Sequence, residues 1–214
     1  MQIAPPQPTE LTIKGRIINR QTRQLAEKAR VRYWAEGGVS NVFTSEDGTF
    51  SLKIPKGVAF DLCPEKAGFT GKTERAFFRR DYYYFKDYFS IDLWLDPMEI
   101  GAVIELKPVF FSQSKALILE QSFSEMERLT QIMEENVGLK IRIEGHTDNI
   151  GKEEDLQQLS EARAQAVKNF LVERGIAAER ISVVGFGARR PINDNATEEL
   201  RQMNRRVEVK ISGI

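Results

Sequence analysis

The spacing of apolar residues changes once along this chain of 214 residues, near Asp96-Pro97, and that change constrains the fold more than any other feature. Before this point, apolar residues alternate with polar ones over short runs separated by turn residues, which is typical of strands. After it, two long stretches carry apolar residues three and four positions apart, which is typical of helices that bury one face. The sequence therefore predicts two domains with separate cores.

The first half is predicted to be a β-sandwich over residues 11–97, preceded by a proline-rich linker at 1–10. Phe50, Leu52 and Ile54 alternate with polar residues after a turn signal, as expected of a half-buried strand. Helical spacing is nearly absent from this half, so two packed sheets are expected.

One stretch of the first half, residues 77–89, is unusually rich in phenylalanine and tyrosine. Its simpler interpretation is packing in the sandwich, because large aromatic side chains are most often buried. The alternative is a contact surface, towards the second domain or a partner, where tyrosine and arginine are enriched.

The second half, residues 101–214, alternates predicted strands with predicted helices. The strands are expected at 102–106, 141–143, 181–184 and 207–211, and the helices at 115–136 and 154–174. This βαβαβ(α)β order predicts a mixed sheet with helices on one face, because strands joined through helices run parallel. The whole chain is therefore expected to be α+β.

Composition argues against several classes of protein. The 31 basic and 31 acidic residues balance, so there is no cationic surplus to favour a nucleic-acid partner. Cys63 has no second cysteine to pair with, and one cysteine with one histidine is a poor basis for a zinc site, so no cofactor or metal is expected. No apolar run approaches the ~18 residues of a membrane span. The first residues lack the regions of a signal peptide, which fits a cytoplasmic protein or a fragment of a longer one, and the prolines favour a fragment.

A candidate binding pair lies in the second half. Asp148 follows a predicted strand, and Arg163 lies on the helix after it. A carboxylate and a guanidinium that face one another across a cleft suit a zwitterion, since the first binds an ammonium and the second binds a carboxylate with two hydrogen bonds. An ordinary structural salt bridge is the alternative.

Other polar residues support weaker interpretations. His146, Ser160 and Asp148 include the residue types of a catalytic triad, but triads are recognised by geometry and not by closeness in sequence. The simpler roles are bracing of a loop for His146 and capping of backbone N–H groups for Ser160. Arg205-Arg206 is expected to pair with acidic residues of its own domain.

A set of motifs in the second half resembles a known family. The motifs, in the order of the family, are Gly145-His146-Thr147-Asp148, Leu159-Ser160-x-x-Arg163-Ala164, Gly175-Ile176, Gly185-x-Gly187, Pro191 and Asn204-Arg205-Arg206-Val207-Glu208. They are similar to those of the OmpA-like C-terminal domain, which is shared with Pal lipoproteins and the flagellar stator. The resemblance implies a non-enzymatic protein that binds peptidoglycan noncovalently, in which Asp148 and Arg163 hold the zwitterionic end of diaminopimelate in the stem peptide. It also implies a periplasmic, outer-membrane-associated location and a role in anchoring an assembly to the cell wall.

Six further residues are secondary candidates for the ligand pocket, namely Phe111, Ser112, His146, Thr147, Leu156 and Leu159. Two of them depart from the family's pattern: Ser112 stands where the family usually has an aspartate, and Leu156 where it usually has an asparagine. These departures leave a second function open, that of a protein-interaction module in an envelope or secretion machine that has lost ligand binding. A wall-degrading enzyme is a third alternative, and the lack of a metal or acid–base constellation argues against it.

The first half has a resemblance of its own. The matching segments are Ile13-Lys14-Gly15-Arg16-Ile17, Ala29-Arg30-Val31, Thr44-Ser45-Glu46-Asp47-Gly48-Thr49-Phe50 and Lys66-Ala67-Gly68-Phe69. They are similar to the carboxypeptidase regulatory-like domain, a prealbumin-type β-sandwich. The junction at 91–101 resembles that of OmpA-family proteins of the Bacteroidetes type, and such domain pairs occur in a periplasmic component of the type 9 secretion system. The resemblance implies outer-membrane or secretion-machine proteins as further partners.

Overall fold

The computed structural model describes residues 10–35, 38–44, 46–55, 59–77 and 88–214. The chain divides into two compact units, Met1–Pro97 and Met98–Ile214, and each encloses an apolar core of its own. Among the described helices, none combines the length and the apolar character needed to cross a membrane.

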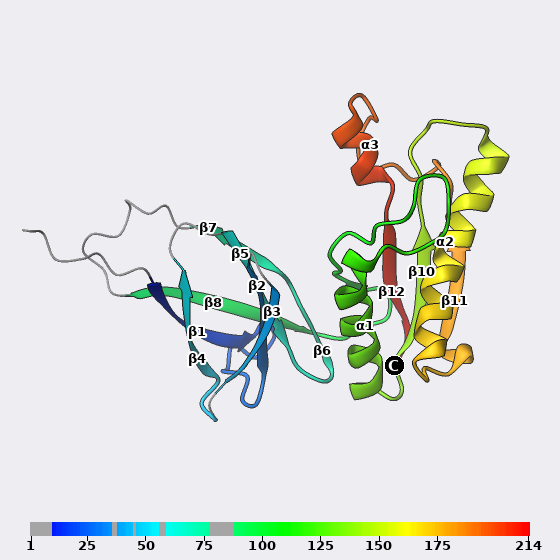
Figure 1. Cartoon of the computed structure of the whole chain (residues 1–214). Coiled ribbons are helices and arrows are strands. Elements are labelled where there is room, and N and C mark those ends of the chain that lie inside the picture. The colour runs from blue at the N-terminus through cyan, green and yellow to red at the C-terminus, as the bar shows by residue number, and fades with distance from the viewer. Residues whose placement is uncertain (1–9, 36–37, 45, 56–58, 78–87) are drawn as a thin grey trace, which may run out of the picture. The chain divides into compact units, whose positions relative to one another are not determined.

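The described elements of the first unit are all strands (Figure 1). They are β1 (Glu10–Asn19), β2 (Arg30–Ala35), β3 (Gly38–Phe43), β4 (Thr49–Pro55), β5 (Ala59–Glu65), β6 (Phe69–Gly71), β7 (Glu74–Phe77) and β8 (Tyr88–Pro97). They form two four-stranded sheets, in the orders β4-β1-β8-β6 and β3-β2-β5-β7. β1 runs parallel to β8 and antiparallel to β4.

The core of the first unit follows from the period-two pattern in the sequence. Ile13 and Ile17 of β1, Leu62 of β5 and Leu93 of β8 are fully buried, so both sheets contribute to one apolar cluster. Residues between them on the same strands point to the other face of their sheet. The aromatic stretch at 77–89 falls largely outside the described residues, so both of its interpretations stay predictions.

The second unit is a mixed α/β arrangement. Its elements are β9 (Val103–Ile104), the 3₁₀ turn η1 (Glu120–Ser122), α1 (Phe123–Glu135), β10 (Lys140–Gly145), α2 (Glu153–Glu173), η2 (Ala178–Arg180), β11 (Ile181–Gly185), α3 (Glu198–Asn204) and β12 (Val207–Gly213). The sheet has the order β11-β10-β12-β9, in which β10 and β11 are parallel and β12 is antiparallel to both of its neighbours. This confirms the mixed sheet and the α+β class.

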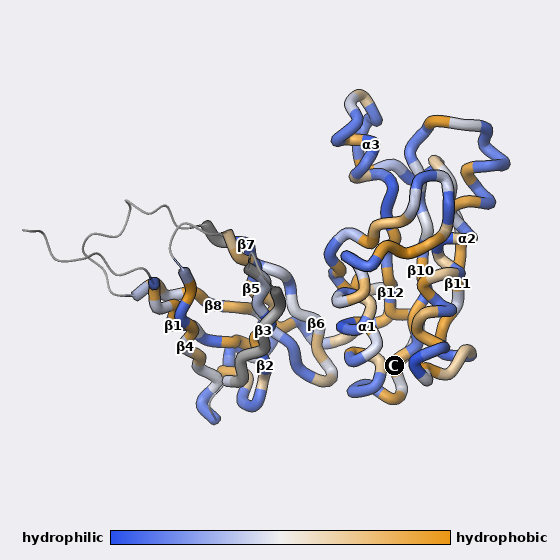
Figure 2. The backbone as a smooth tube through the Cα atoms, viewed as in Figure 1, coloured by the Kyte–Doolittle hydropathy of each residue, from blue (hydrophilic) through white to orange (hydrophobic). Residues whose placement is uncertain are grey.

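Helices α1 and α2 contact one another and cover one face of this sheet (Figure 1). Met126 and Leu129 of α1 and Val167 and Leu171 of α2 are fully buried against the sheet. Figure 2 shows polar and apolar residues alternating along both helices, as expected of helices that bury one face.

Two boundaries predicted from the sequence are wrong. The strand expected at 102–106 pairs only over Val103–Ile104. The helix expected from residue 115 begins at Phe123, because the chain before it turns back on itself. Ser114 has a left-handed φ of 52°, and Phe111 forms an antiparallel bridge with Ile118. The apolar residues at 117–119 therefore belong to a loop and not to a helix face.

Glycines let α2 lie unusually close to the ends of two strands. A Cβ atom on Gly145, at the end of β10, would lie 2.0 Å from the carbonyl oxygen of Ser160. A Cβ atom on Gly185, at the end of β11, would lie 2.6 Å from the amide nitrogen of Glu161. Because α2 rests on these bare strand ends, its next turn places Arg163 beside the loop that follows β10.

Candidate ligand-binding site

A cavity of about 850 Å³ lies in the second unit at the carboxyl end of β10. Four segments line it: residues 108–111 with 113–114, the loop after β10, the first half of α2, and α3 with the residue that follows it. Ligand sites are common at the carboxyl ends of parallel strands, because the loops there converge from several elements.

Asp148 lies three residues beyond the end of β10 and is 8% exposed. Its loop is fixed by backbone bonds, since the Thr147 amide donates to the carbonyl of Gly187 at 3.0 Å. Asp148 Oδ1 accepts the amide N–H of Ile150 at 3.0 Å, and Oδ2 accepts Nη1 of Arg205 at 2.6 Å. Both carboxylate oxygens are therefore oriented before any ligand arrives.

Arg163 lies on α2 and is 6% exposed. Its Nε donates to the carbonyl of Lys115 at 3.3 Å, and its guanidinium carbon lies 5.1 Å from the centre of the Phe111 ring. Within the described part of the chain, no carboxylate lies within ion-pairing distance of this guanidinium. Asp148 pairs with Arg205 and not with Arg163.

The electrostatic surroundings of Arg163 are unfavourable to its charge. Burial lowers the pKa of its guanidinium, the positive charge of Arg205 lowers it further, and Asp148 opposes both effects. A buried cation that lacks a counter-ion is costly, and a ligand carboxylate would relieve that cost. The site is thus suited to an anion at Arg163.

The residues predicted for the pocket are only partly brought together. Asp148 and Arg163 line the cavity, as do four of the six secondary candidates, namely Phe111, Thr147, Leu156 and Leu159. Ser112 does not line it. Its backbone closes the turn before α1 by accepting from the amide of Lys115 and donating to the carbonyl of Leu117.

The sequence did not single out α3 as a cavity wall. Glu198 and Arg201 of α3 line the cavity together with Arg205, and Arg205 bonds both Glu198 and Asp148. The expectation that Arg205 pairs with acidic residues of its own domain is confirmed. The motif Asn204-Arg205-Arg206 is the signal that could have suggested that Arg205 belongs to the site. Asp148, however, lies 57 positions away in the sequence, so no local pattern links the two residues.

His146 lies outside the cavity lining, in a buried charge network on the other side of its loop. It is 1% exposed, its ring stacks on Phe186, and neither ring nitrogen has a hydrogen-bond partner among the described residues. Burial, helped by the charge of Arg206, lowers the pKa of His146 to about 4. The imidazole is therefore neutral near pH 7. Its nitrogens make no bond to Ser160, whose hydroxyl donates to the carbonyl of Gln157, so these two residues do not form a nucleophile–base pair.

Glu144 and Glu208 lie beside His146 at a spacing that would suit metal ligands. Both carboxylates, however, are held by cations: Lys210 Nζ lies 2.8 Å from Glu144, and Arg206 Nη2 lies 2.6 Å from Glu208. Burial raises the pKa of Glu144, but hydrogen bonds from Lys210 and Arg142 outweigh it and hold that pKa below its usual value. The cluster is an ion network that covers the sheet face opposite the helices, and not a set of free ligands.

Comparison with known proteins places the second unit in a family. The model of the OmpA family matches residues 110–205. These residues form an OmpA-family domain. Outer membrane porin F of Pseudomonas fluorescens is 40% identical over 103 residues, which are 48% of this chain and 32% of the porin. The peptidoglycan-binding protein ArfA of Mycobacterium bovis is 35% identical over 105 residues, 49% of this chain and 32% of ArfA. The chain thus spans about a third of the length of these relatives.

Solved structures give matches of similar extent. The C-terminal domain of Helicobacter pylori MotB is 25% identical, with a TM-score of 0.47, over 50% of this chain and 85% of that one. The peptidoglycan-associated lipoprotein of Burkholderia pseudomallei is 23% identical, with a TM-score of 0.46, over 50% of this chain and 91% of that one. The carboxypeptidase regulatory-like domain and the Bacteroidetes type stay predictions.

Proposed function

We propose that the second unit binds peptidoglycan noncovalently through the zwitterionic end of diaminopimelate, and that the chain anchors an envelope assembly to the cell wall. The OmpA-family domain and the name of the relative ArfA, a peptidoglycan-binding protein, support a wall ligand. The observation that carries the proposal is Arg163, a buried guanidinium that lacks a carboxylate partner among the described residues and lines the same cavity as Asp148.

In this proposal, the ligand carboxylate binds the N–H groups of Arg163 that no protein acceptor takes. Charge-assisted hydrogen bonds are worth about 1.5–3 kcal/mol each when shielded from water. The ring of Phe111 under the guanidinium and the bond to Lys115 limit its rotamers, so little conformational entropy is lost on binding.

The ligand ammonium binds Asp148 in competition with Arg205. Each carboxylate oxygen can accept more than one hydrogen bond, so an ammonium can be added without displacing the bond from Ile150. Arg205 also bonds Glu198, which gives it a second partner if the ammonium weakens its bond to Asp148. The net charge of the occupied site then stays balanced, because ammonium and carboxylate arrive together.

A second candidate is a protein-interaction module that no longer binds the wall. One observation favours it: Asp148 is already paired with Arg205 at 2.6 Å, and Leu156 makes part of the cavity wall apolar. This internal ion pair would lower the affinity for an ammonium, because Asp148 would have to be shared between Arg205 and the ligand.

The remaining parts of the proposal concern the setting. We place the protein in the periplasm, associated with the outer membrane, where its OmpA-family domain can reach the wall. The first unit, proposed as a carboxypeptidase regulatory-like domain, would contact outer-membrane or secretion-machine proteins. We assign the protein no enzymatic role.

Sedimentation with purified peptidoglycan tests the proposal. The wild-type chain should pellet with the wall without releasing fragments, and Asp148→Ala and Arg163→Ala should each lower the bound fraction, with affinity reduced by about one to two decades. Arg174→Ala is the matched control, since it removes an arginine at the C-terminal end of the same helix, about 16 Å from Arg163 along the helix axis and outside the cavity lining. Wild-type protein that stays in the supernatant would favour the interaction module, and release of wall fragments would favour an enzyme.

A further inference from the structure

A second concave surface lies in the first unit, on the face of the β4-β1-β8 sheet that points away from the core. This trough has a volume of about 840 Å³. Lys14 and Arg16 of β1 are exposed at its walls, whereas Ile13 and Ile17 on the same strand are fully buried in the core. The charged and hydroxyl-bearing side chains of the lining therefore project from the solvent face of the sheet, whereas Phe50, which also lines the trough, belongs to the core.

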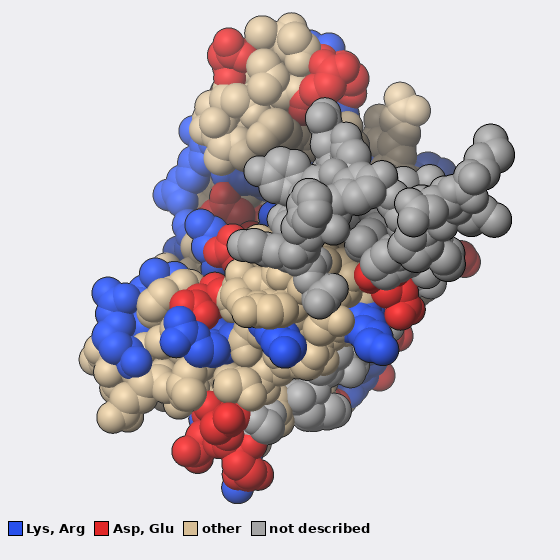
Figure 3. Space-filling model, turned by 90° about the vertical axis from the view of Figure 1, so that its left-hand side faces the viewer, with Lys and Arg blue, Asp and Glu red and all other residues tan. Residues whose placement is uncertain are grey.

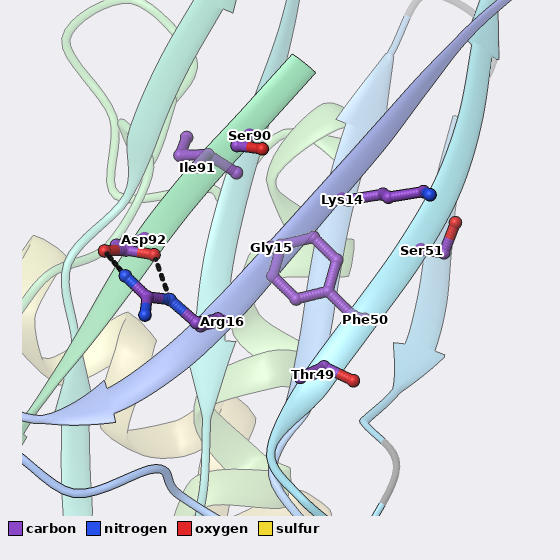
Figure 4. Close-up of a pocket in the computed structure, with 9 residues that line it drawn as sticks. All are labelled: Lys14, Gly15, Arg16, Thr49, Phe50, Ser51, Ser90, Ile91 and Asp92. Carbon is purple, nitrogen blue, oxygen red and sulfur yellow. Dashed lines mark hydrogen bonds and ion pairs between the residues drawn. The ribbon is translucent and has the colours of Figure 1, made fainter. Parts of the chain in front are cut away.

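Strand register places two rows of polar side chains across the trough. Lys14 lies opposite Ser51 of β4 and Ser90 of β8. In the next row, Arg16 lies opposite Thr49 and Asp92. The lining thus offers three hydroxyl groups, each able to donate and accept, on the strands that flank the charged side chains of β1 (Figure 4).

Arg16 and Asp92 form a planar pair with two parallel hydrogen bonds, Nε to Oδ1 at 2.9 Å and Nη2 to Oδ2 at 2.6 Å (Figure 4). The pair fixes both side chains in one orientation, and both are open to solvent. The two hydrogen bonds do not use all the N–H groups of Arg16 or all the lone pairs of Asp92, so the pair presents donors and acceptors side by side to solvent.

Two aromatic residues of β8, Tyr88 and Trp94, flank the segment 90–92 that lines the trough, although neither belongs to the lining itself. Tyr88, which is 51% exposed, lies beside Lys14, whose Nζ is 4.9 Å from the ring centre. Trp94 lies six residues further along β8 and is flanked by two guanidiniums at 5.1 and 5.2 Å from its ring. Six strand residues span about 20 Å, so the surface matches an elongated ligand and not a compact one.

The charge of the trough argues against a polyanion. Asp92 neutralises Arg16, which leaves Lys14 as the net charge of the lining. Figure 3 shows basic and acidic side chains interspersed on the face that it presents, whereas binding of a polyanion relies on a surplus of one sign. A hydroxyl-rich ligand with little charge fits this lining best.

We infer that the trough binds an extended oligosaccharide. The sugar hydroxyls would bond to the Arg16–Asp92 pair and to Ser90, and the C–H face of a terminal sugar ring would pack on the exposed ring of Tyr88. This inference does not rest on the proposed function, because the trough and the OmpA-family cavity belong to different units.

Calorimetric titration of the full chain tests the inference with three probes: peptide-free glycan strands prepared from peptidoglycan, cellohexaose, and a stem tripeptide. The double variant Arg16→Ala/Asp92→Ala should weaken glycan binding on the order of tenfold, because several hydrogen bonds are lost together. Both side chains are solvent-exposed, so the fold should tolerate the change. Lys28→Ala/Glu46→Ala removes another exposed ion pair of the same unit and should leave glycan binding unchanged.

The outcomes separate this inference from the proposed function. Binding of both glycans, weakened by the trough variant and not by Arg163→Ala, supports a general oligosaccharide site. Binding of the peptidoglycan strands alone, with the same dependence, supports the inference and identifies the wall as its source. Binding of the tripeptide alone overturns the inference and leaves the proposed function standing. Glycan binding that survives in the trough variant also overturns it.

Discussion

Gly145 is the residue on which the geometry of the OmpA-family cavity depends most, and Gly145→Ala is the substitution that tests this. The new Cβ atom would lie 2.0 Å from the carbonyl oxygen and 2.8 Å from the carbonyl carbon of Ser160. Both are backbone atoms of α2 and cannot rotate away, so the helix must move by roughly 1 Å. Overpacking of this kind costs about 1–3 kcal/mol. In a unit of this size, the melting temperature should fall by about 10 °C.

The same shift should disturb the ligand site beyond its effect on stability. Ser160 lies one helical turn before Arg163, so moving this turn displaces the guanidinium relative to Asp148. Misplacement of a binding group by about 1 Å weakens its directional hydrogen bonds. Affinity for the wall should therefore fall in Gly145→Ala even at temperatures where the protein is fully folded.

Thermal melts followed by circular dichroism, together with wall sedimentation at 20 °C below each midpoint, provide the assay. Gly213→Ala is the control, because its Cβ would meet only side-chain atoms of Lys140, at 3.3 Å or more. A melting temperature for Gly145→Ala within about 2 °C of wild type, with wall binding unchanged, would refute the argument that close helix–strand contact fixes the site.

Three further predictions concern stability. Glu144→Ala should lower the free energy of unfolding by about 3 kcal/mol, since this fully buried carboxylate pairs with Lys210. Arg142→Ala, at a half-exposed side chain, should lower it by no more than about 1 kcal/mol. Urea unfolding measures both variants, and equal losses would contradict the argument from burial. Folding lowers the pKa of His146 from 6.5 to about 4, so protonation of this residue favours the unfolded chain. The stability that the neutral imidazole allows is therefore complete above pH 6.5 and is lost as pH falls towards 4. This amounts to roughly 2 kcal/mol between pH 7.5 and 5, and His146→Phe should remove that part of the pH dependence in urea melts. Residues 98–214, expressed alone, should fold cooperatively, and a molten chain by near-UV circular dichroism would contradict separate cores.

The sequence predicted the order of elements in the second unit because periodicity is a local signal. It failed before α1, where Leu119 continues the apolar spacing of the helix but lies in a loop. The late start of that helix goes with the bridge between Phe111 and Ile118, a tertiary contact that periodicity does not report. The two-residue strand β9 was overestimated for a related reason, since only Val103 and Ile104 find partners on β12.

The site was predictable in part. Asp148 and Arg163 were suggested by their placement at a strand end and on the next helix, and both line the cavity. Arg205 was expected to pair with acidic residues, but its place beside Asp148 depends on α3 packing across the loop after β10, which no local pattern encodes. His146 was misplaced as a pocket candidate because adjacent residues of an irregular loop can point to opposite sides, and Thr147 faces the cavity instead.

The central claim is that Arg163 recognises a carboxylate next to an ammonium, and one calorimetric comparison tests it directly. The ligands are a stem tripeptide that contains meso-diaminopimelate and the same peptide with lysine, which keeps the ammonium but lacks the second carboxylate. The wild-type chain should bind the first about one to two decades more tightly, and Arg163→Lys should lose most of that preference, because a single ammonium cannot replace the two-pronged guanidinium. Equal affinity of the wild-type chain for both peptides, or a preference that survives in Arg163→Lys, would contradict the account.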